Sequence, residues 1–422
     1  MRMKAAIVAL LLALATPVFA AEPLPTAKPE SVGMSSPRLE RIGQTLRADI
    51  EKGRMPGAVV AIARKGKLVY YEAFGFLDKA AGTPMPKDAI FAIASMTKPL
   101  AGVATMLLVE EGKIFVGEPA ATYVPALGKM PVAVLSADGR TITETVPAKR
   151  PMTVQDLMRH TSGLTYGGRG DTAVHKLYPA SSTVASRTYT AAEFMEKLVT
   201  LPLLYQPGTV WEYGLSTDVL GVVVETVSKQ PLGQFLAARV FKPLGMVDTG
   251  FVIPAAKAAR YARALPNDPE TGRPQSVPDF TTPLKFECGG GCAVSTAADY
   301  VRFAQMLLNA GRFNGTQLLG RKSVALMTAD HLTPDIQNNV AKVDASRTGY
   351  GFGLTMAVRQ APGAAGLLGS AGDFSWGGAN GTNFWVDPKE QLVVVFMAHT
   401  PGATRVHYRK VMNALVLQAI TD

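Results

Sequence analysis

The chain has 422 residues, of which 47% are hydrophobic and 18% are charged, and its formal net charge is +10. This composition excludes wholesale disorder, which requires low hydrophobicity and high charge. The basic residues form only short, interrupted clusters, at positions 64–67 and 405–410. Because nucleic-acid binding needs a continuous basic surface, we expect no nucleic-acid partner.

The first twenty residues have the pattern of a secretory signal peptide. Arg2 and Lys4 precede an uninterrupted apolar stretch at positions 5–15, and Val-Phe-Ala at positions 18–20 has the spacing of a cleavage site. We expect cleavage near Ala20 and export to a periplasm or to the medium. The apolar stretch is shorter than a membrane span, so no stable membrane insertion is expected.

Hydrophobic periodicity and turn residues predict the elements that follow. The expected helices are residues 36–53, 97–111, 217–229, 232–241, a helix capped by Ser295-Thr296, and 405–420. The expected strands are residues 57–63 and 68–74, which form a hairpin, and later 350–358, 381–386 and 391–399. Two stretches of low periodicity, 167–187 and 333–349, are predicted to be surface loops that border a site.

The order of these elements predicts an α+β fold with one antiparallel sheet flanked by helices. The early hairpin and the late strands can join in that sheet. We therefore expect residues 21–115 and 288–422 to form a discontinuous α/β domain, with residues 116–287 as an inserted, mainly helical domain.

Ser95 and Lys98 are the first candidates for catalysis. Ser95 lies where a loop becomes the buried helix, and residues three apart share one helix face, so its hydroxyl and the lysine amine can meet. A serine hydroxyl needs a base to act as a nucleophile. The alternative is that Ser95 only caps the helix and Lys98 is a surface residue.

Other hydrolytic motifs are missing from the sequence. It contains no Gly-x-Ser-x-Gly segment and no His-Glu-x-x-His segment. His160 ends a predicted helix, and we interpret it as structural, with ring hydrogen bonds to the backbone. No metal or cofactor is expected.

Cys288 and Cys292 flank three glycines. An oxidising compartment favours a disulfide, and the glycines allow the tight turn. Two free thiols are the alternative, while a zinc site would need ligands that the neighbouring sequence lacks.

Two further segments contain candidate catalytic or substrate-binding groups. Tyr213 lies on a tight loop just before a helix and can act as a base or proton relay if a neighbouring ammonium lowers its pKa. The segment that begins Ser375-Trp376-Gly377-Gly378-Ala379 has the pattern of a strand edge that glycines keep open to a ligand. Its N–H groups, with that of Ser95, can stabilise an oxyanion.

Taken together, these motifs resemble the serine β-lactamase and penicillin-binding-protein superfamily, most closely its class C branch and family VIII carboxylesterases. The resemblance runs from about Glu30 to Ile420. The matching pieces are Ser95-x-x-Lys98, His160-Thr-Ser-Gly163, Pro207-Gly208 before Tyr213, the segment from Gly289 to Thr296, and Trp376-Gly377-Gly378.

The resemblance implies a role for each matching residue. It makes Ser95 the residue that is acylated, and Lys98 and Tyr213 the groups that shuttle its proton, in an order that remains open. Water then releases the acyl group. The backbone N–H groups of Ser95 and Ala379 form the oxyanion hole.

Two departures from the pattern bear on the substrate. Where β-lactamases and peptidases have Tyr-x-Asn, this chain has Tyr213-Gly-Leu215, and where they have Lys-Thr-Gly it has Trp376-Gly377-Gly378. Loss of the Asn and the Lys is expected to favour neutral, apolar acyl esters over anionic lactams or D-alanyl peptides. Arg405 is open to two interpretations, as a substitute cation or as a surface residue.

The sequence thus predicts an exported serine hydrolase that cleaves short-chain or aryl carboxylic esters, with a small molecule as its partner. One alternative is a β-lactamase, D-alanyl-D-alanine peptidase or amide hydrolase on the same Ser-Lys-Tyr machinery. The other is a catalytically silent ligand-binding relative. The oligomeric state stays open.

Overall fold

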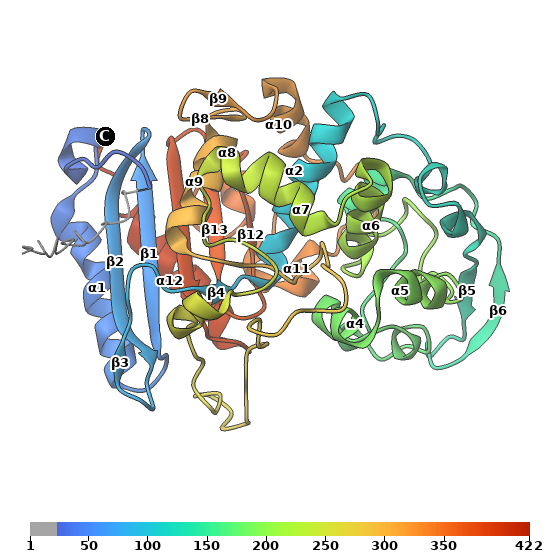
Figure 1. The fold of residues 1–422 in the computed structure, drawn as a ribbon, viewed down its shortest axis with the longest axis horizontal. Helices are drawn as coiled ribbons and strands as arrows, with labels where there is room; N and C mark the ends of the chain where they lie inside the picture. The colour runs from blue at the N-terminus through green and yellow to red at the C-terminus, as the bar shows by residue number, and fades with distance from the viewer. Residues whose placement is uncertain (1–22) are drawn as a thin grey trace, which may run out of the picture.

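A large antiparallel sheet organises the computed structural model, which describes residues 23–422. The predicted signal peptide lies outside these residues. The sheet has eight strands in the order β10-β11-β12-β13-β14-β1-β2-β3 (Figure 1). Their bounds are β1 Gly57–Arg64, β2 Lys67–Asp78, β3 Thr83–Pro84, β10 Tyr350–Phe352, β11 Ala357–Arg359, β12 Phe374–Gly377, β13 Asn383–Asp387 and β14 Leu392–Ala398.

The contact between β1 and β14 joins the two ends of the chain. They pair antiparallel over seven residues, from Ala58 opposite Ala398 to Arg64 opposite Leu392. All eight residues of β1 and all seven of β14 are buried. Both strands read as continuous apolar runs because each is covered on both faces. The expected sheet of early and late strands is therefore confirmed.

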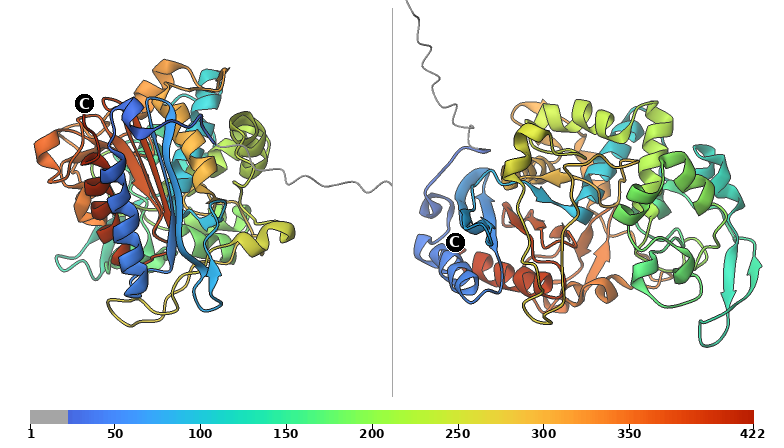
Figure 2. Two further views of the ribbon diagram at one scale, coloured as in Figure 1. Left: turned by 90° about the vertical axis from the view of Figure 1, so that its left-hand side faces the viewer. Right: turned by 60° about the horizontal axis from the view of Figure 1, so that its bottom comes forward.

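Helices cover the two faces of this sheet. On one face, α1 (Ser36–Glu51) and α12 (Thr404–Leu417) pack side by side, and on the other lies α9 (Ala297–Leu308), as the left view of Figure 2 shows. Alternate side chains of β1 serve each face, since successive residues of a strand point to opposite sides. Val60 and Ile62 pack with α1 and α12, whereas Val59 and Ala61 face the core that contains α9.

Part of the segment between the early and late strands, from β5 to α6, forms the opposite end of the molecule (Figure 1). The bounds of its elements, and of α2 and α7, which flank it in the chain, are α2 Thr97–Glu110, β5 Val132–Leu135, β6 Ile142–Val146, α3 Val154–Met158, α4 Ser182–Thr188, α5 Ala191–Leu198, α6 Ser216–Ser228 and α7 Leu232–Leu236. The division of the chain into two domains with the boundaries given above remains a prediction.

Three sequence-based assignments need correction. The predicted strand 350–358 is two strands, because Thr355 adopts a positive φ of 76° and the amide of Gly353 bonds the carbonyl of Met356 to close a turn. The predicted helix 232–241 stops being α-helical at Leu236 and continues as a π-helical turn, Ala237–Phe241. The two predicted loops contain short helices, among them α4 and α11 (Val340–Val343).

Among residues 23–422, no helix combines the length and the apolar character needed to cross a membrane.

A hydrogen bond from α9 connects the core to the segment that contains Ser95. The hydroxyl of Tyr300, which is fully buried, donates to the carbonyl of Met96 at 2.8 Å. We expect Tyr300→Phe to lower the free energy of unfolding by about 1 kcal/mol, because it removes one fully buried hydrogen bond. Urea denaturation measures the change. The control is Tyr189→Phe, which should stay within about 0.5 kcal/mol of wild type.

Candidate active site

Ser95 is held in a short 3-10 turn, Ala94–Met96, at the beginning of α2. Ala94 has a positive φ of 43°, which is uncommon for a residue with a side chain. The Thr97 hydroxyl stabilises this turn by donating to the Ala94 carbonyl at 2.7 Å and accepting from the Ala293 amide at 3.0 Å. The Ser95 turn is therefore fixed to a segment about 200 positions later in the chain.

Lys98 is fully buried, so the alternative that it is a surface residue is wrong. Its Nζ donates to the carbonyl of Gly290 at 2.5 Å and lies 3.4 Å from both the Ser95 Oγ and the Tyr166 hydroxyl. It also lies 4.5 Å from the centre of the Tyr213 ring. One ammonium thus contacts the serine and both tyrosines.

Tyr213 lies just before α6, as expected, and is almost completely buried. The indole Nε1 of Trp376 donates to its hydroxyl at 3.2 Å. Burial by itself would raise the pKa of Tyr213, but Lys98, the Ser95 hydroxyl and Arg169 act in the opposite direction, and the pKa is lowered below its usual value. A lowered pKa increases the fraction of phenolate, which is the form that can accept a proton.

His160 packs against the ring of Tyr213. The two rings lie 4.8 Å apart, and burial holds the pKa of His160 well below its usual value, so the imidazole is neutral. Its Nε2 is 3.3 Å from the hydroxyl of Thr217, whereas its Nδ1 has no partner among the described residues. The structural role agrees with our interpretation, but the predicted ring-to-backbone hydrogen bonds are wrong.

A polar network that the sequence does not predict lies beside Lys98. The hydroxyl of Tyr166 is 2.6 Å from that of Ser182, which donates to the Asp218 carboxylate at 2.8 Å. Burial raises the pKa of Asp218, although Lys98 and the hydrogen bonds oppose this effect. These residues come from three separate segments, and no spacing rule relates them, so the sequence contains no signal for the network.

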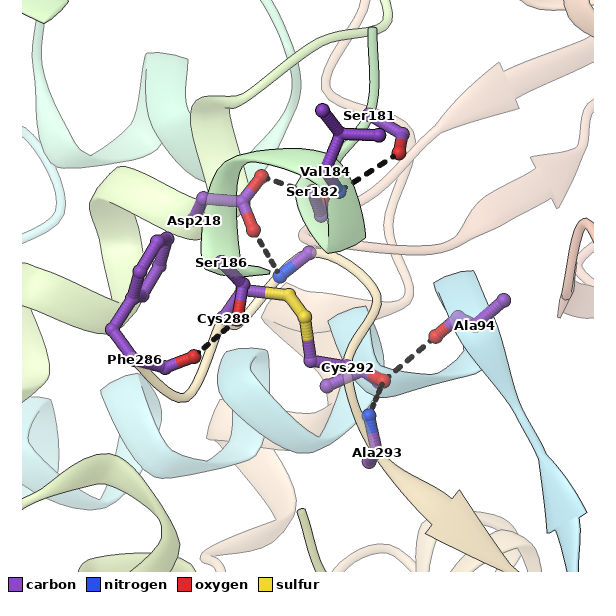
Figure 3. The surroundings of a disulfide bond; sticks show 12 residues. Ala94, Ser181, Ser182, Val184, Ser186, Asp218, Phe286, Cys288, Cys292 and Ala293 are labelled. Atoms are coloured by element: carbon purple, nitrogen blue, oxygen red, sulfur yellow. Dashed lines mark hydrogen bonds between the residues drawn. A yellow bond between two sulfur atoms is a disulfide. The ribbon is translucent and has the colours of Figure 1, made fainter. Parts of the chain in front are cut away.

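Cys288 and Cys292 are joined in a disulfide, and both are fully buried (Figure 3). The ring that they close contains Gly290, whose amide donates to Asp218 at 2.9 Å and whose carbonyl accepts from Lys98. A Cβ at Gly290 would lie 2.5 Å from the Asp218 carboxylate, so any other residue here would displace that carboxylate. The disulfide therefore closes the turn that carries the main hydrogen-bond acceptor of Lys98.

The turn after β12 lies against the segment that precedes Ser95. Asn380 donates to the Ala92 carbonyl at 3.1 Å, and Thr382 donates to the Ile93 carbonyl at 3.2 Å. A Cβ at Gly378 would lie 2.5 Å from the Ile93 carbonyl, so this close approach requires glycine. These contacts hold Ala379 near Ser95, and both residues line the same pocket.

Two spaces open beside Ser95. The wide pocket has a volume of about 460 Å³, and its walls include Tyr166, Val184 and Pro278. The second, which we call the arginine recess, has a volume of about 20 Å³. Its walls include Ser95, Tyr213, Trp376, Gly377, Ala379, Asp344 and the arginines 169, 347, 405 and 409.

The predicted substrate-binding residues divide between these spaces and the core. Trp376, Gly377 and Ala379 line the arginine recess, whereas Leu215 and Gly378 line neither space. Leu215 is fully buried, so the structure does not support its predicted contact with substrate. The predicted loops at 167–187 and 333–349 do border the site, since Arg169 and Asp344 line it.

A serine with a buried lysine and tyrosine, set beside an open pocket on this fold, is the arrangement of a serine hydrolase. The chain belongs to the β-lactamase family, which it matches over residues 42–418.

Curated relatives and a solved structure agree with this assignment. The chain is 36% identical to Protein Rv1367c of Mycobacterium tuberculosis, with 85% of this chain and 89% of the relative covered. It is 31% identical to Esterase EstB of Burkholderia gladioli, with 83% and 88% covered. The structure of EstCE1, a hydrolase with promiscuous acyltransferase activity, superimposes with a TM-score of 0.74 at 25% identity, covering 90% of this chain and 98% of that one.

The Trp376 hydrogen bond gives a testable pH dependence. A donor to the hydroxyl oxygen favours the phenolate of Tyr213, so Trp376→Phe should raise the pKa of Tyr213. We expect the acid limb of the kcat/KM profile to move to higher pH and kcat/KM at pH 7 to fall about tenfold. Trp385→Phe is the control, because the Trp385 Nε1 is buried without a partner among the described residues. An unchanged acid limb in Trp376→Phe would contradict the assignment.

The disulfide gives a second prediction. In the double variant Cys288→Ala/Cys292→Ala, the free energy of unfolding should fall by about 2 kcal/mol. This value is the chain entropy that so short a disulfide loop removes from the unfolded state. Because the Gly290 carbonyl is no longer held against Lys98, kcat/KM should also fall about tenfold or more at a temperature where the variant is fully folded. Circular dichroism checks that the variant is folded, and a wild-type kcat/KM in the folded variant would contradict the prediction.

Proposed function

We propose that this protein is an exported serine hydrolase that cleaves carboxylic esters through an acyl-enzyme on Ser95. The observation that carries the proposal is the buried Lys98 ammonium, 3.4 Å from the Ser95 hydroxyl and packed against the Tyr213 ring. Ser95 also lines both spaces of the site, so its hydroxyl is open to a substrate. The ester-cleaving relatives EstB and lovastatin esterase support the same reaction class.

The reaction proceeds in two halves. The Ser95 Oγ attacks the ester carbonyl while its proton passes to the Lys98–Tyr213 pair, and the backbone N–H groups of Ser95 and Ala379 stabilise the oxyanion. Collapse of this intermediate expels the alcohol, which takes the proton from the pair. Water then attacks the acyl-enzyme with the same groups as base and releases the acid.

The size and walls of the wide pocket support short-chain or aryl esters. Its volume of about 460 Å³ accommodates a small acyl group, and Val184 and Pro278 supply apolar surface. Trp376 occupies the place of the lysine in the Lys-Thr-Gly pattern and bonds Tyr213 instead of presenting a charge to the substrate. Export is supported by the signal-peptide pattern and by the disulfide, which persists in oxidising compartments.

A β-lactamase reaction on the same machinery is the second candidate. The observation that favours it is the arginine recess beside Ser95, because lactam substrates are anionic. Comparing kcat/KM for nitrocefin and for p-nitrophenyl butyrate in the same preparation decides between them. We expect the ester to be the better substrate, and a much higher value for nitrocefin would replace our choice.

Replacing the nucleophile tests the proposal directly. Ser95→Ala should lose p-nitrophenyl butyrate hydrolysis by about a thousandfold or more, because no other group can form the acyl-enzyme. Intact mass measured during turnover should show the acyl adduct in wild type and not in the variant. The matched control is Ser136→Ala in the turn between β5 and β6, which should keep the wild-type rate. Equal rates for wild type and Ser95→Ala would refute the assignment.

A further inference from the structure

We propose that His175 is a positioning residue for the hydrolysis: it links the neighbour of Arg169 to the neighbour of Tyr213 and so keeps the Arg169 guanidinium over the Tyr213 ring. The inference rests on the proposed function, in which Tyr213 belongs to the base. It follows from the closed loop that carries both His175 and Arg169, from the groups that face the imidazole, and from the charges around Tyr213.

Residues 167–180 form a closed loop beside the site. Two backbone hydrogen bonds of 2.9 and 3.3 Å join its ends, and the first runs from the amide of Gly167 to the carbonyl of Pro179. Arg169 lies at one end of the loop and lines both spaces beside Ser95. Compact loops whose ends meet are packed by their own side chains. A side chain inside this loop can therefore fix the position of Arg169.

His175 is the side chain that packs against the loop backbone next to Arg169. Its imidazole is buried, and a Cβ at Gly170 would lie 2.6 to 2.8 Å from three atoms of the ring. Gly170 directly follows Arg169 in the chain. The backbone at Gly170 is therefore in direct contact with the imidazole, and loss of the ring would remove its support.

The imidazole also faces the segment that carries Tyr213. Its Nε2 lies 3.5 Å from the Oε1 of Glu212, the residue before Tyr213, and its Nδ1 lies 2.7 Å from the hydroxyl of Thr172. A carboxylate only accepts hydrogen bonds, so Nε2 carries a proton. The Thr165 hydroxyl holds the same Glu212 oxygen by donating to it at 2.7 Å. One imidazole thus bridges the neighbours of Arg169 and Tyr213.

Arg169 depends on this support because its side chain has no other anchor. Within residues 23–422, its guanidinium has neither an ion-pair nor a hydrogen-bond partner, and it lies 5.1 Å from the centre of the Tyr213 ring. A cation over an aromatic face is attracted to it, but only weakly at a site open to water. The backbone must therefore bring the guanidinium within reach of the ring.

The position of Arg169 bears on how readily Tyr213 accepts a proton. Burial raises the pKa of Tyr213, whereas Lys98, the Ser95 hydroxyl and Arg169 lower it. When a cation moves away, part of this lowering is lost, and the phenolate is then protonated at a higher pH. The acid limb of the reaction therefore reports where Arg169 lies.

The other ionisable side chains around Tyr213 lie outside the loop. They are Lys98 of α2, His160, Tyr166 and Arg405 of α12. A substitution of His175 therefore leaves these groups in place. Arg405 also lines the recess beside Ser95 and is only partly exposed, so its interpretation as a surface residue is wrong.

Variants of His175 and Arg169, alone and together, test the proposal. His175→Leu removes the ring and its donor, and Arg169→Gln removes the charge. With p-nitrophenyl butyrate, each should move the acid limb of kcat/KM up by about half a pH unit and lower kcat/KM on that limb about threefold, the effect of one exposed cation–π contact. The double variant should match Arg169→Gln, because His175 acts through Arg169.

Two further variants control for general damage to the loop. His175→Gln carries an amide donor in place of the Nε2–H and should keep the limb close to that of wild type. Lys176→Gln removes an exposed charge from the same loop and should leave the limb unchanged. Circular dichroism checks folding. If His175→Leu does not fold, His175→Phe replaces it with the same expected shift, because it keeps a ring against Gly170 but offers no donor to Glu212.

The outcomes separate this proposal from the proposed function. An acid limb at the wild-type position in folded His175→Leu or His175→Phe would overturn the role of His175. A double variant whose shift is the sum of the two single shifts would also overturn it, since His175 would then act independently of Arg169. In wild type, absence of both ester hydrolysis and fluorophosphonate labelling of Ser95 would instead refute the proposed function.

Discussion

The site depends on the hydrogen bonds that one buried ammonium, that of Lys98, makes with its neighbours. Lys98 has no exposed surface, so its charge must be balanced by hydrogen bonds and by neighbouring polar groups. The Gly290 carbonyl accepts its shortest hydrogen bond, and the Ser95 and Tyr166 hydroxyls lie within reach. Since a charge held in a low-dielectric interior acts strongly on its neighbours, the same ammonium lowers the pKa of Tyr213.

The rest of the fold serves to bring the acceptors of that ammonium together. The short strands β4 (Phe91–Ala92) and β7 (Val294–Ser295) pair antiparallel, which places the Ser95 turn beside the disulfide ring. The ring presents the Gly290 carbonyl, and the turn after β12 closes the site from the sheet side. Substitutions in this support, at positions that do not line the pocket, are therefore expected to act on catalysis as well as on stability.

Much of the fold and part of the site could be predicted from local patterns. The helix at 97–111, the closing helix and the buried strands β1 and β14 lie within a few residues of their predicted positions, because turn residues bound their apolar segments. The serine–lysine contact also follows locally, because a spacing of three residues sets it. The turn that splits 350–358 into two strands could not be predicted, since a positive φ at Thr355 has no sequence signature.

By itself, the sequence determined which chemical groups are present and the order in which they occur: Ser95, Lys98, Tyr213 and the Trp376 segment. Only the tertiary structure decided what surrounds them. Lys98 and Gly290 are 192 positions apart, and Arg169 and Arg405, which are far apart in the sequence, line the same recess as Ser95. The physical reason is that charge and burial act through space at distances of a few ångströms, whereas sequence patterns report only neighbours along one helix or strand.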